Sequence, residues 1–248
     1  MSRLAIADAF SQLTRAATTS DELYAALLDV SISMGFAFFA LIHHADILLV
    51  GGKAIRLHNY PADWVEYYDA NALGLVDPVH RASHMTNEGF VWSNIAGLMP
   101  LTANDNRMFE LGAAKGLGNG YTVPNNIPGE PMGSCTFANG VGVAMPVDML
   151  PVAQLVGLAA FQCARRLWEI RPISTGKPRL TGRQREIVVW GGRGKSDWDT
   201  SRILDLKEDT VARHFKDARK KYGVGKRILV IIHALRDGTL SFLDFEPY

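Results

Sequence analysis

Two glycine-rich stretches of the sequence contain residue types that could bind phosphate. The segment Gly191–Ser196 (GGRGKS) matches only the end of a phosphate-binding loop. The full motif needs a glycine five residues before its Gly-Lys pair, and Val189 occupies that position. The segment Gly116–Gly120 has part of the spacing of a dinucleotide-binding loop, but it lies between an expected helix and an expected strand, the reverse of the required order. We therefore expect both segments to be turns.

Histidine and cysteine side chains are the next candidates, because they act as metal ligands and nucleophiles. His43 is followed directly by His44, and His80 and His84 have the i, i+4 spacing of one helix face. The sequence provides neither pair with a third ligand or an HExxH-type glutamate, so we expect no metal site. Cys135 has no base that the sequence makes evident, and no GxSxG motif occurs. The sequence thus predicts neither an enzyme nor a cofactor.

The clearest chemical signal is a basic helix in the C-terminal third of the chain. An expected nine-residue helix and a three-residue turn lead into a second helix, Glu208–Tyr222. Val211 and Phe215, four residues apart, would face inward. We expect them to pack against Ile203 and Leu204 of the preceding helix.

The opposite face of this second helix is basic, and its residues are Arg213, Lys216, Lys220 and Lys221. A helix-turn-helix of this geometry lays its second helix in the major groove of DNA. Lys and Arg neutralise phosphates there, and near the groove floor they donate hydrogen bonds to guanine. The alternative is a solvated basic surface with no partner.

Length and composition are those of a globular protein with one large domain or two modest ones. Of the 248 residues, 48% are apolar and 21% are charged. The most apolar stretch, 145–164, includes Asp148 and Pro151, which argues against a membrane span. Asp8 interrupts the first apolar residues, so we expect no signal peptide. Two cysteines cannot frame a disulfide-built domain and fit a reducing cytoplasm.

Charge divides the chain into two unlike parts. Residues 1–170 contain 9 Lys and Arg against 15 Asp and Glu, whereas residues 171–248 contain 17 against 10. An acidic body joined to a basic tail indicates a polyanionic partner for the tail alone. Residues 171–179 carry two prolines and a glycine without apolar periodicity, which is typical of a linker. We therefore expect domains at 1–170 and 180–248.

The N-terminal domain alternates helical and strand patterns. Expected helices span 4–17, 20–34, 61–73, a short segment opened by Asp77-Pro78, 101–117 and 147–170. Ser20 is the expected N-cap of the second helix. Expected strands span 36–43, 47–50, 90–92, 120–124 and 133–139. This order predicts an α–β–α sandwich with one mostly antiparallel sheet, which is an α+β fold suited to holding a small molecule.

The tail domain is predicted to be four helices. Thr181 and Gln184 form an expected capping box for the first, which ends at the glycines around Arg193. Ser196 is the expected cap of the second helix. Gly223 ends the third, and the fourth spans 226–236.

The segment Leu180–Arg227 strongly resembles the DNA-binding domain of the LuxR family of quorum-sensing regulators. The similarity lies in LTxRxxE, in GKS followed by an aromatic residue, in TVxxHxKxA and in the closing YGV. Gln184, Lys207 and Ala212 differ from the usual family residues. The resemblance and the basic face together give candidate DNA-contacting residues Lys195, Thr210, Arg213, His214, Lys216, Arg219 and Lys220. The resemblance also implies that the protein binds double-stranded DNA as a homodimer.

The N-terminal part resembles the autoinducer-binding domain of the same family. The matching segments are NYPADWVEYYDANALGLVDPV, FVWS and GLGNGYTVP. Members of this family bind N-acyl-homoserine lactones. By position, the resemblance implies a ligand site made of Tyr60, Trp64, Tyr68, Asp77, Trp92 and Thr136.

The resemblance also implies a role for each of these residues. Trp64 would donate its indole N–H to the lactone carbonyl, Asp77 would accept the amide N–H, and Tyr68 would bond the amide carbonyl. Thr136 would assist there, while Trp92 and Tyr60 would form walls. A buried carboxylate without a partner costs about 1–3 kcal/mol or more, so ligand binding and folding would be linked.

Two alternatives remain open at this point. A regulator of the same fold could respond to an aryl or non-lactone signal, or to none. An enzyme could occupy the sandwich domain, with an attached DNA-binding module. The acyl-chain length, the DNA target and the sign of regulation cannot be read from these residues.

Overall fold

The computed structural model describes residues 2–44, 54–128, 130–170 and 180–246. The chain forms two compact units, Met1–Arg171 and Pro172–Tyr248. The expected linker at 171–179 and the expected strand at 47–50 lie outside the described residues.

A five-stranded antiparallel sheet forms the centre of the first unit. Its strands are β1 (Phe38–His43), β2 (Arg56–His58), β3 (Phe90–Val91), β4 (Gly120–Asn125) and β5 (Gly133–Ala138). They lie in the order β2-β1-β5-β4-β3, and every neighbouring pair is antiparallel. The predicted α+β class with an antiparallel sheet is confirmed.

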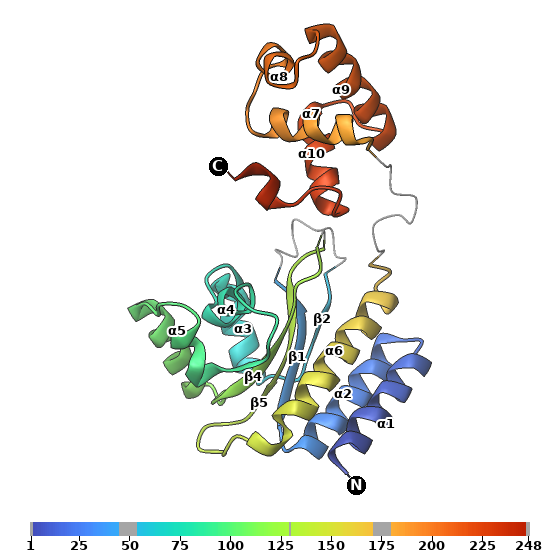
Figure 1. Cartoon of the computed structure of the whole chain (residues 1–248). Helices are drawn as coiled ribbons and strands as arrows, with labels where there is room; N and C mark the ends of the chain where they lie inside the picture. The colour runs from blue at the N-terminus through green and yellow to red at the C-terminus, as the bar shows by residue number, and fades with distance from the viewer. Residues whose placement is uncertain (1, 45–53, 129, 171–179, 247–248) are drawn as a thin grey trace. The chain divides into compact units, whose positions relative to one another are not determined.

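Helices cover both faces of this sheet, as Figure 1 shows. One face carries α1 (Arg3–Ala16), α2 (Ser20–Met34) and α6 (Leu150–Leu167). The other carries α3 (Ala62–Ala70), α4 (Pro78–Ser83) and α5 (Ala103–Ala114), with 3-10 turns η1 (Leu73–Leu75) and η2 (Trp92–Gly97). A further turn, η3 (Val147–Met149), precedes α6.

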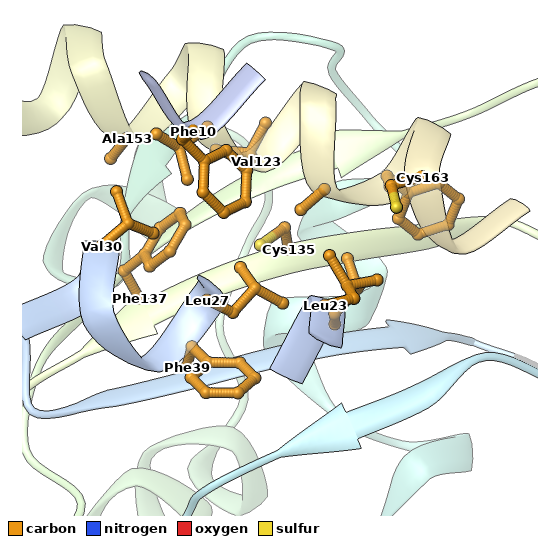
Figure 2. Close-up of a cluster of buried hydrophobic side chains, with 14 of the residues drawn as sticks. Phe10, Leu23, Leu27, Val30, Phe39, Val123, Cys135, Phe137, Ala153 and Cys163 are labelled. Carbon is orange, nitrogen blue, oxygen red and sulfur yellow. The ribbon is translucent and has the colours of Figure 1, made fainter. Parts of the chain in front are cut away.

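Strand alternation divides the sheet into a filled face and a face with space. Phe39 and Leu41 of β1 and Phe137 of β5 are fully buried in the core below α2 and α6. Figure 2 shows this core, with Leu27 of α2 directed toward the strands. Small residues point the other way: Ala40 is paired with Thr136. The opposite face therefore leaves room beneath α3 and α4.

The apolar helix α6 belongs to this core. Within the described residues, Val147–Leu167 is the stretch whose length and composition would allow it to cross a membrane. Its inner face, which includes Val156, Ala160 and Phe161, is fully buried or nearly so. Gly157 lets the helix approach the sheet, because a Cβ there would lie 2.9 Å from Val123 Cβ. The hydrophobicity of α6 is therefore that of a core helix.

Several expected boundaries in this unit were wrong. The helix expected at 101–117 spans Ala103–Ala114, and the strand expected at 36–43 begins at Phe38. The helix expected at 61–73 ends at Ala70, because Ala72 has φ +48° and η1 follows as a 3-10 turn. The expected strand 90–92 ends at Val91, where η2 begins. The helix expected at 147–170 begins as the 3-10 turn η3 and ends at Leu167.

The second unit contains α7 (Gly182–Gly192), α8 (Asp197–Leu204), α9 (Glu208–Tyr222), α10 (Arg227–Arg236) and a 3-10 turn η4 (Phe242–Phe245). The Thr181–Gln184 capping box and the Ser196 cap are present. Val211 and Phe215 are buried in its core as predicted. Leu204 packs against that core, but the predicted packing of Ile203 is wrong, because its side chain is 44% exposed.

The cap of α2 is also corrected. Thr19, not Ser20, is the N-cap: its backbone is extended and its hydroxyl accepts the Glu22 amide N–H. The Glu22 carboxylate accepts the Thr19 amide N–H in return, which completes a capping box. The same contacts lower the pKa of Glu22, chiefly through the backbone N–H of Thr18.

This assignment gives a first prediction. Thr19→Ala should lower the free energy of unfolding by about 1 kcal/mol, because a helix loses its N-cap. Ser20→Ala is the matched control and should have a much smaller effect. Urea titration of the full chain followed by circular dichroism measures both. A larger loss of stability for Ser20→Ala than for Thr19→Ala would show that Ser20 is the N-cap.

Candidate ligand pocket and DNA-binding helix

A pocket of about 340 Å³ lies between the sheet and helices α3, α4 and α5. Ala40, Ile42 and Thr136 form part of its sheet wall. All six predicted ligand residues line it: Tyr60, Trp64, Tyr68, Asp77, Trp92 and Thr136, of which Tyr60, Tyr68 and Trp92 are half-buried. The tertiary structure thus gathers residues that lie up to 76 positions apart in the chain.

Asp77 is the best-connected polar residue of the pocket. It is the N-cap of α4, and its Oδ1 accepts the Val79 amide N–H at 2.7 Å. Its Oδ2 accepts the Tyr68 hydroxyl at 2.7 Å, which joins α4 to α3. Burial, followed by the charge of Asp77, raises the pKa of Tyr68 far above its ordinary value. The expectation that this carboxylate has no partner without ligand is therefore wrong.

Trp64 and Trp92 provide the aromatic walls at one end of the pocket. Trp64 is 6% exposed on α3, and its ring lies edge-on to Tyr68. The Trp92 indole N–H donates to Thr122 Oγ1 at 2.9 Å. Its ring lies over Gly120, where a Cβ would lie only 2.7 Å from the indole. A glycine is needed at this position because the ring occupies the space of a side chain.

Thr136 continues the polar row on the sheet. Its hydroxyl lies 2.8 Å from that of Thr122, so the Trp92, Thr122 and Thr136 side chains form one chain of hydrogen bonds. Tyr60 lies beside them, and burial, with Asp77 as a further cause, raises the pKa of its hydroxyl. A neutral phenol and two threonines are suited to hydrogen-bond an uncharged amide or ester.

The opposite end of the pocket is lined by residues that were not predicted for it, among them His44, Arg56, His58 and His80. His44 follows β1, and Arg56 and His58 belong to β2, a strand that the sequence patterns did not predict. Arg56 forms an ion pair with Asp69 at 2.7 Å. His80 lies three residues after Asp77 on α4, which is the spacing that places it on the same face.

Three histidines meet here, and we call His44, His80 and His84 the histidine cluster. The His44 ring stacks on His80 with centroids 3.9 Å apart. His44 Nδ1 lies 3.0 Å from His84 Nε2, and His44 Nε2 lies 2.9 Å from Ser134 Oγ. Within the described residues, no group of three or more side chains has the arrangement of a metal site.

The second unit presents the predicted basic helix. On α9, Arg213, Lys216 and Lys220 are exposed, whereas Thr210 and His214 are half-buried. Arg219 lies apart from this surface: its guanidinium donates to the Gly225 carbonyl at 3.0 Å. Lys195 is exposed in the turn before α8.

Packing on α7, α8 and α10 holds α9 in place. Phe215 lies at 2% exposure on its inner side, and the Arg227 guanidinium lies 4.4 Å from the centroid of its ring. Arg227 also forms an ion pair with Asp197 at the start of α8. Lys207 caps α9 without a side-chain hydrogen bond, and Glu208 and Asp209 occupy its first turn, where acidic residues favour the helix dipole.

Comparisons with known proteins match both units. Residues 19–167 match the family model "Autoinducer binding domain", and residues 178–234 match "Bacterial regulatory proteins, luxR family". The quorum sensing-dependent transcriptional regulator RpaR of Rhodopseudomonas palustris is 30% identical over 187 residues, which is 74% of each chain. The chain belongs to the LuxR family of autoinducer-binding transcriptional regulators.

Solved structures of another regulatory protein share the fold. Escherichia coli SdiA superposes with a TM-score of 0.62 at 20% identity, covering 96% of this chain and 99% of that one. A structure of SdiA in complex with octanoyl-rac-glycerol superposes with a TM-score of 0.61 at 21% identity, covering 100% and 99%. By sequence, the SdiA regulatory protein is 24% identical, covering 90% of this chain and 91% of its own.

Membership of the LuxR family accounts for both the ligand pocket of the first unit and the basic helix of the second. The chain is a quorum-sensing transcription regulator with an autoinducer-binding domain and a helix-turn-helix DNA-binding domain, and it is not an enzyme. The glycine-rich segments are turns only in part: Gly191 and Gly192 end α7 and residues 193–196 join it to α8, while residues 115–119 join α5 to β4, which begins at Gly120. Burial raises the pKa of the Cys135 thiol far above its ordinary value, which keeps it protonated and unreactive.

The histidines of this LuxR-family pocket should make the folded state less stable in acid. Burial, followed by His80 and His84, lowers the pKa of His44 well below 6.5, and burial lowers that of His58. The unfolded chain then binds more protons than the folded chain below about pH 6.5, so stability falls as the pH is lowered through that value.

Melting temperatures of the full chain at intervals from about pH 7.5 to 5 measure this loss. His44→Gln removes a titrating group, so its melting temperature should fall less steeply with acid than that of the wild type. An identical slope in the variant would show that His44 does not contribute.

Proposed function

We propose that the pocket of the first unit binds an N-acyl-homoserine lactone, and that the ligand-bound protein dimerises and binds inverted-repeat DNA. The observation that carries this proposal is the buried carboxylate of Asp77, which lies in one pocket with Trp64 and Thr136. A lactone amide presents one N–H donor and several carbonyl acceptors on an apolar body. A carboxylate, neutral hydroxyl groups and an aromatic wall complement those groups.

Each site residue has a proposed contact. Asp77 Oδ2 has a second lone pair for the ligand amide N–H, besides the one that accepts from Tyr68. Tyr68 has one hydroxyl proton, so it bonds the amide carbonyl only by turning that proton away from Asp77. Trp64 donates its indole N–H to the lactone carbonyl. Thr136 assists at the amide, and Trp92 and Tyr60 form walls.

Ligand binding would stabilise the receptor by mass action. A ligand at one hundred times its dissociation constant contributes about 2.7 kcal/mol to the stability of the folded state. Since Asp77 joins α3 to α4, a ligand held by that carboxylate would stabilise both helices at once.

Two exposed apolar surfaces support dimerisation. Helix α6 and the turn before it expose Val147, Leu155 and Leu158, and α10 exposes Ile228, Leu229 and Ile232. Apolar residues on the outer face of a helix favour burial against a partner. A twofold dimer would set two α9 helices about 34–36 Å apart, in successive major grooves.

The DNA contacts divide by position on α9. Arg213, Lys216 and Lys220 are exposed on α9, where they would contact phosphates and base edges. Thr210, His214 and Lys195 would contact DNA at the margins of this basic surface. We assign Arg219 a weaker role because its guanidinium already donates to Gly225. The free buried thiol of Cys135 is compatible with a reducing compartment, so we place this regulator in the cytoplasm. We also propose that residues 171–179 separate the ligand-binding domain from the DNA-binding domain.

A second candidate is a non-lactone signal. The structure of SdiA in complex with octanoyl-rac-glycerol shows that this fold accommodates an acyl compound without a lactone ring. Such a ligand has no amide N–H, so a hydrogen bond to Asp77 would have to come from a glycerol hydroxyl.

The central test measures the melting temperature of the full chain with a panel of acyl-homoserine lactones. One acyl class should raise it for the wild type. Asp77→Asn should weaken binding about 10–100-fold, because a hydrogen bond to a charged group contributes about 1.5–3 kcal/mol. Asn still caps a helix, so α4 should remain folded.

Asp63→Asn is the matched control, because this exposed carboxylate lies in the first turn of α3 outside the pocket. It should bind like the wild type. Equal ligand responses for Asp77→Asn and wild type would refute the site. An unchanged melting temperature across the panel, with a rise on adding acyl glycerol, would favour the second candidate.

The DNA-binding part has its own prediction. Lys216→Ala should weaken DNA binding and reduce the slope of log affinity against log salt by about 1, because one phosphate contact is lost. Ligand affinity should not change. Fluorescence anisotropy with an inverted-repeat duplex measures the first effect, and Lys115→Ala, at the residue that follows α5 in the first unit, is the control. A parallel loss of ligand affinity would contradict the division of functions.

A further inference from the structure

The His80 ring is held in one orientation at the wall of the pocket. Its Nδ1 lies 3.3 Å from the Gly74 carbonyl oxygen, and its face stacks on His44. His44 is itself fixed by Ser134 and His84. Only 8% of His80 is exposed, so the ring has little freedom to turn away.

This orientation determines which nitrogen of His80 is a donor. A carbonyl oxygen can only accept, so the contact with Gly74 requires the proton on Nδ1. A neutral imidazole has a single N–H, and Nε2 therefore carries a lone pair. Nε2 lies 3.8 Å from Asp77 Oδ2, too far for a hydrogen bond, and none to another described residue is present. Two acceptors thus lie side by side at the pocket.

A pair of adjacent acceptors selects a ligand with two donors in succession. In the proposed binding mode, Asp77 accepts the ligand amide N–H. A hydroxyl on the third carbon of the acyl chain lies within a few bonds of that amide, so its O–H can reach a second acceptor nearby. A ketone at the same carbon brings only lone pairs toward Nε2, and an unsubstituted chain leaves Nε2 without a partner.

Building on the proposed lactone site, we propose that the preferred signal is a 3-hydroxyacyl-homoserine lactone whose hydroxyl donates to His80 Nε2. His80 is then a specificity-determining residue. The remainder of the acyl chain lies against Ile42, Ile55 and Val79, which line the same end of the pocket. Burial is the chief cause of the low pKa of His44, so the ring that stacks on His80 is neutral.

The test compares three lactones of equal chain length on the full-length protein. N-(3-hydroxyoctanoyl)-, N-(3-oxooctanoyl)- and N-octanoyl-homoserine lactone are titrated by calorimetry at pH 7.5. The hydroxy compound should bind about tenfold more tightly than the unsubstituted one, as one buried hydrogen bond is gained. The oxo compound should bind more weakly than the hydroxy compound.

A pair of variants assigns the preference to one ring. His80→Phe keeps an aromatic ring to stack on His44 but has no nitrogen, so the hydroxy preference should disappear while octanoyl lactone still binds. His233→Phe is the matched control, because it makes the same substitution on α10 of the second unit and does not line the pocket, so the preference should persist. If His80→Phe fails to fold, the wild-type comparison still decides whether the hydroxy compound is preferred.

The outcomes separate this inference from the proposed function. Equal binding of the three lactones by the wild type, or a preference that survives in His80→Phe, overturns the role of His80 and leaves the lactone receptor standing. Failure of all three compounds to bind overturns the 3-hydroxy inference, and the wider lactone panel then decides whether the receptor proposal also falls.

Discussion

The carboxylate of Asp77 is the interaction on which the pocket depends. It ends the loop after η1, caps α4 and accepts the Tyr68 hydroxyl of α3, so one buried group joins two helices. A buried charge is tolerated only when its oxygens are satisfied, and the protein supplies three donors for them: the Val79 and His80 amides and the Tyr68 phenol. The same carboxylate is then available at the pocket wall with α3 and α4 already in place.

The sheet explains why a cavity exists above this carboxylate. The large side chains of Phe39 and Phe137 point toward α2 and α6, where packing is complete. The other face carries Ala40, Thr136 and Gly120, which are too small to reach the helices above them. The Trp92 ring fills the space over Gly120, and its indole N–H donates to Thr122. This end of the cavity is therefore aromatic, whereas the other end is lined by histidines.

The two units separate two kinds of chemistry. The first is net acidic and encloses polar groups such as Tyr68 and His44, whose pKa values are shifted by burial. The second is net basic and exposes its charges on α9, where they gain most from a polyanion. Each unit has its own hydrophobic core, so a change such as Lys216→Ala can alter one function without entering the other.

Periodicity, capping residues and charge determined most of the fold from the sequence alone. The antiparallel sandwich, the four tail helices and the Thr181 and Ser196 caps follow from local patterns, because a helix face or cap depends on residues only a few positions apart. The six ligand positions came from family motifs, not from local physics. Only the tertiary structure showed that Asp77 is already bonded to Tyr68, that Ile203 is exposed and that Arg219 bonds the backbone. It also brought His44 to His80 across 36 positions, since contacts between β1 and α4 leave no periodic signal in the chain.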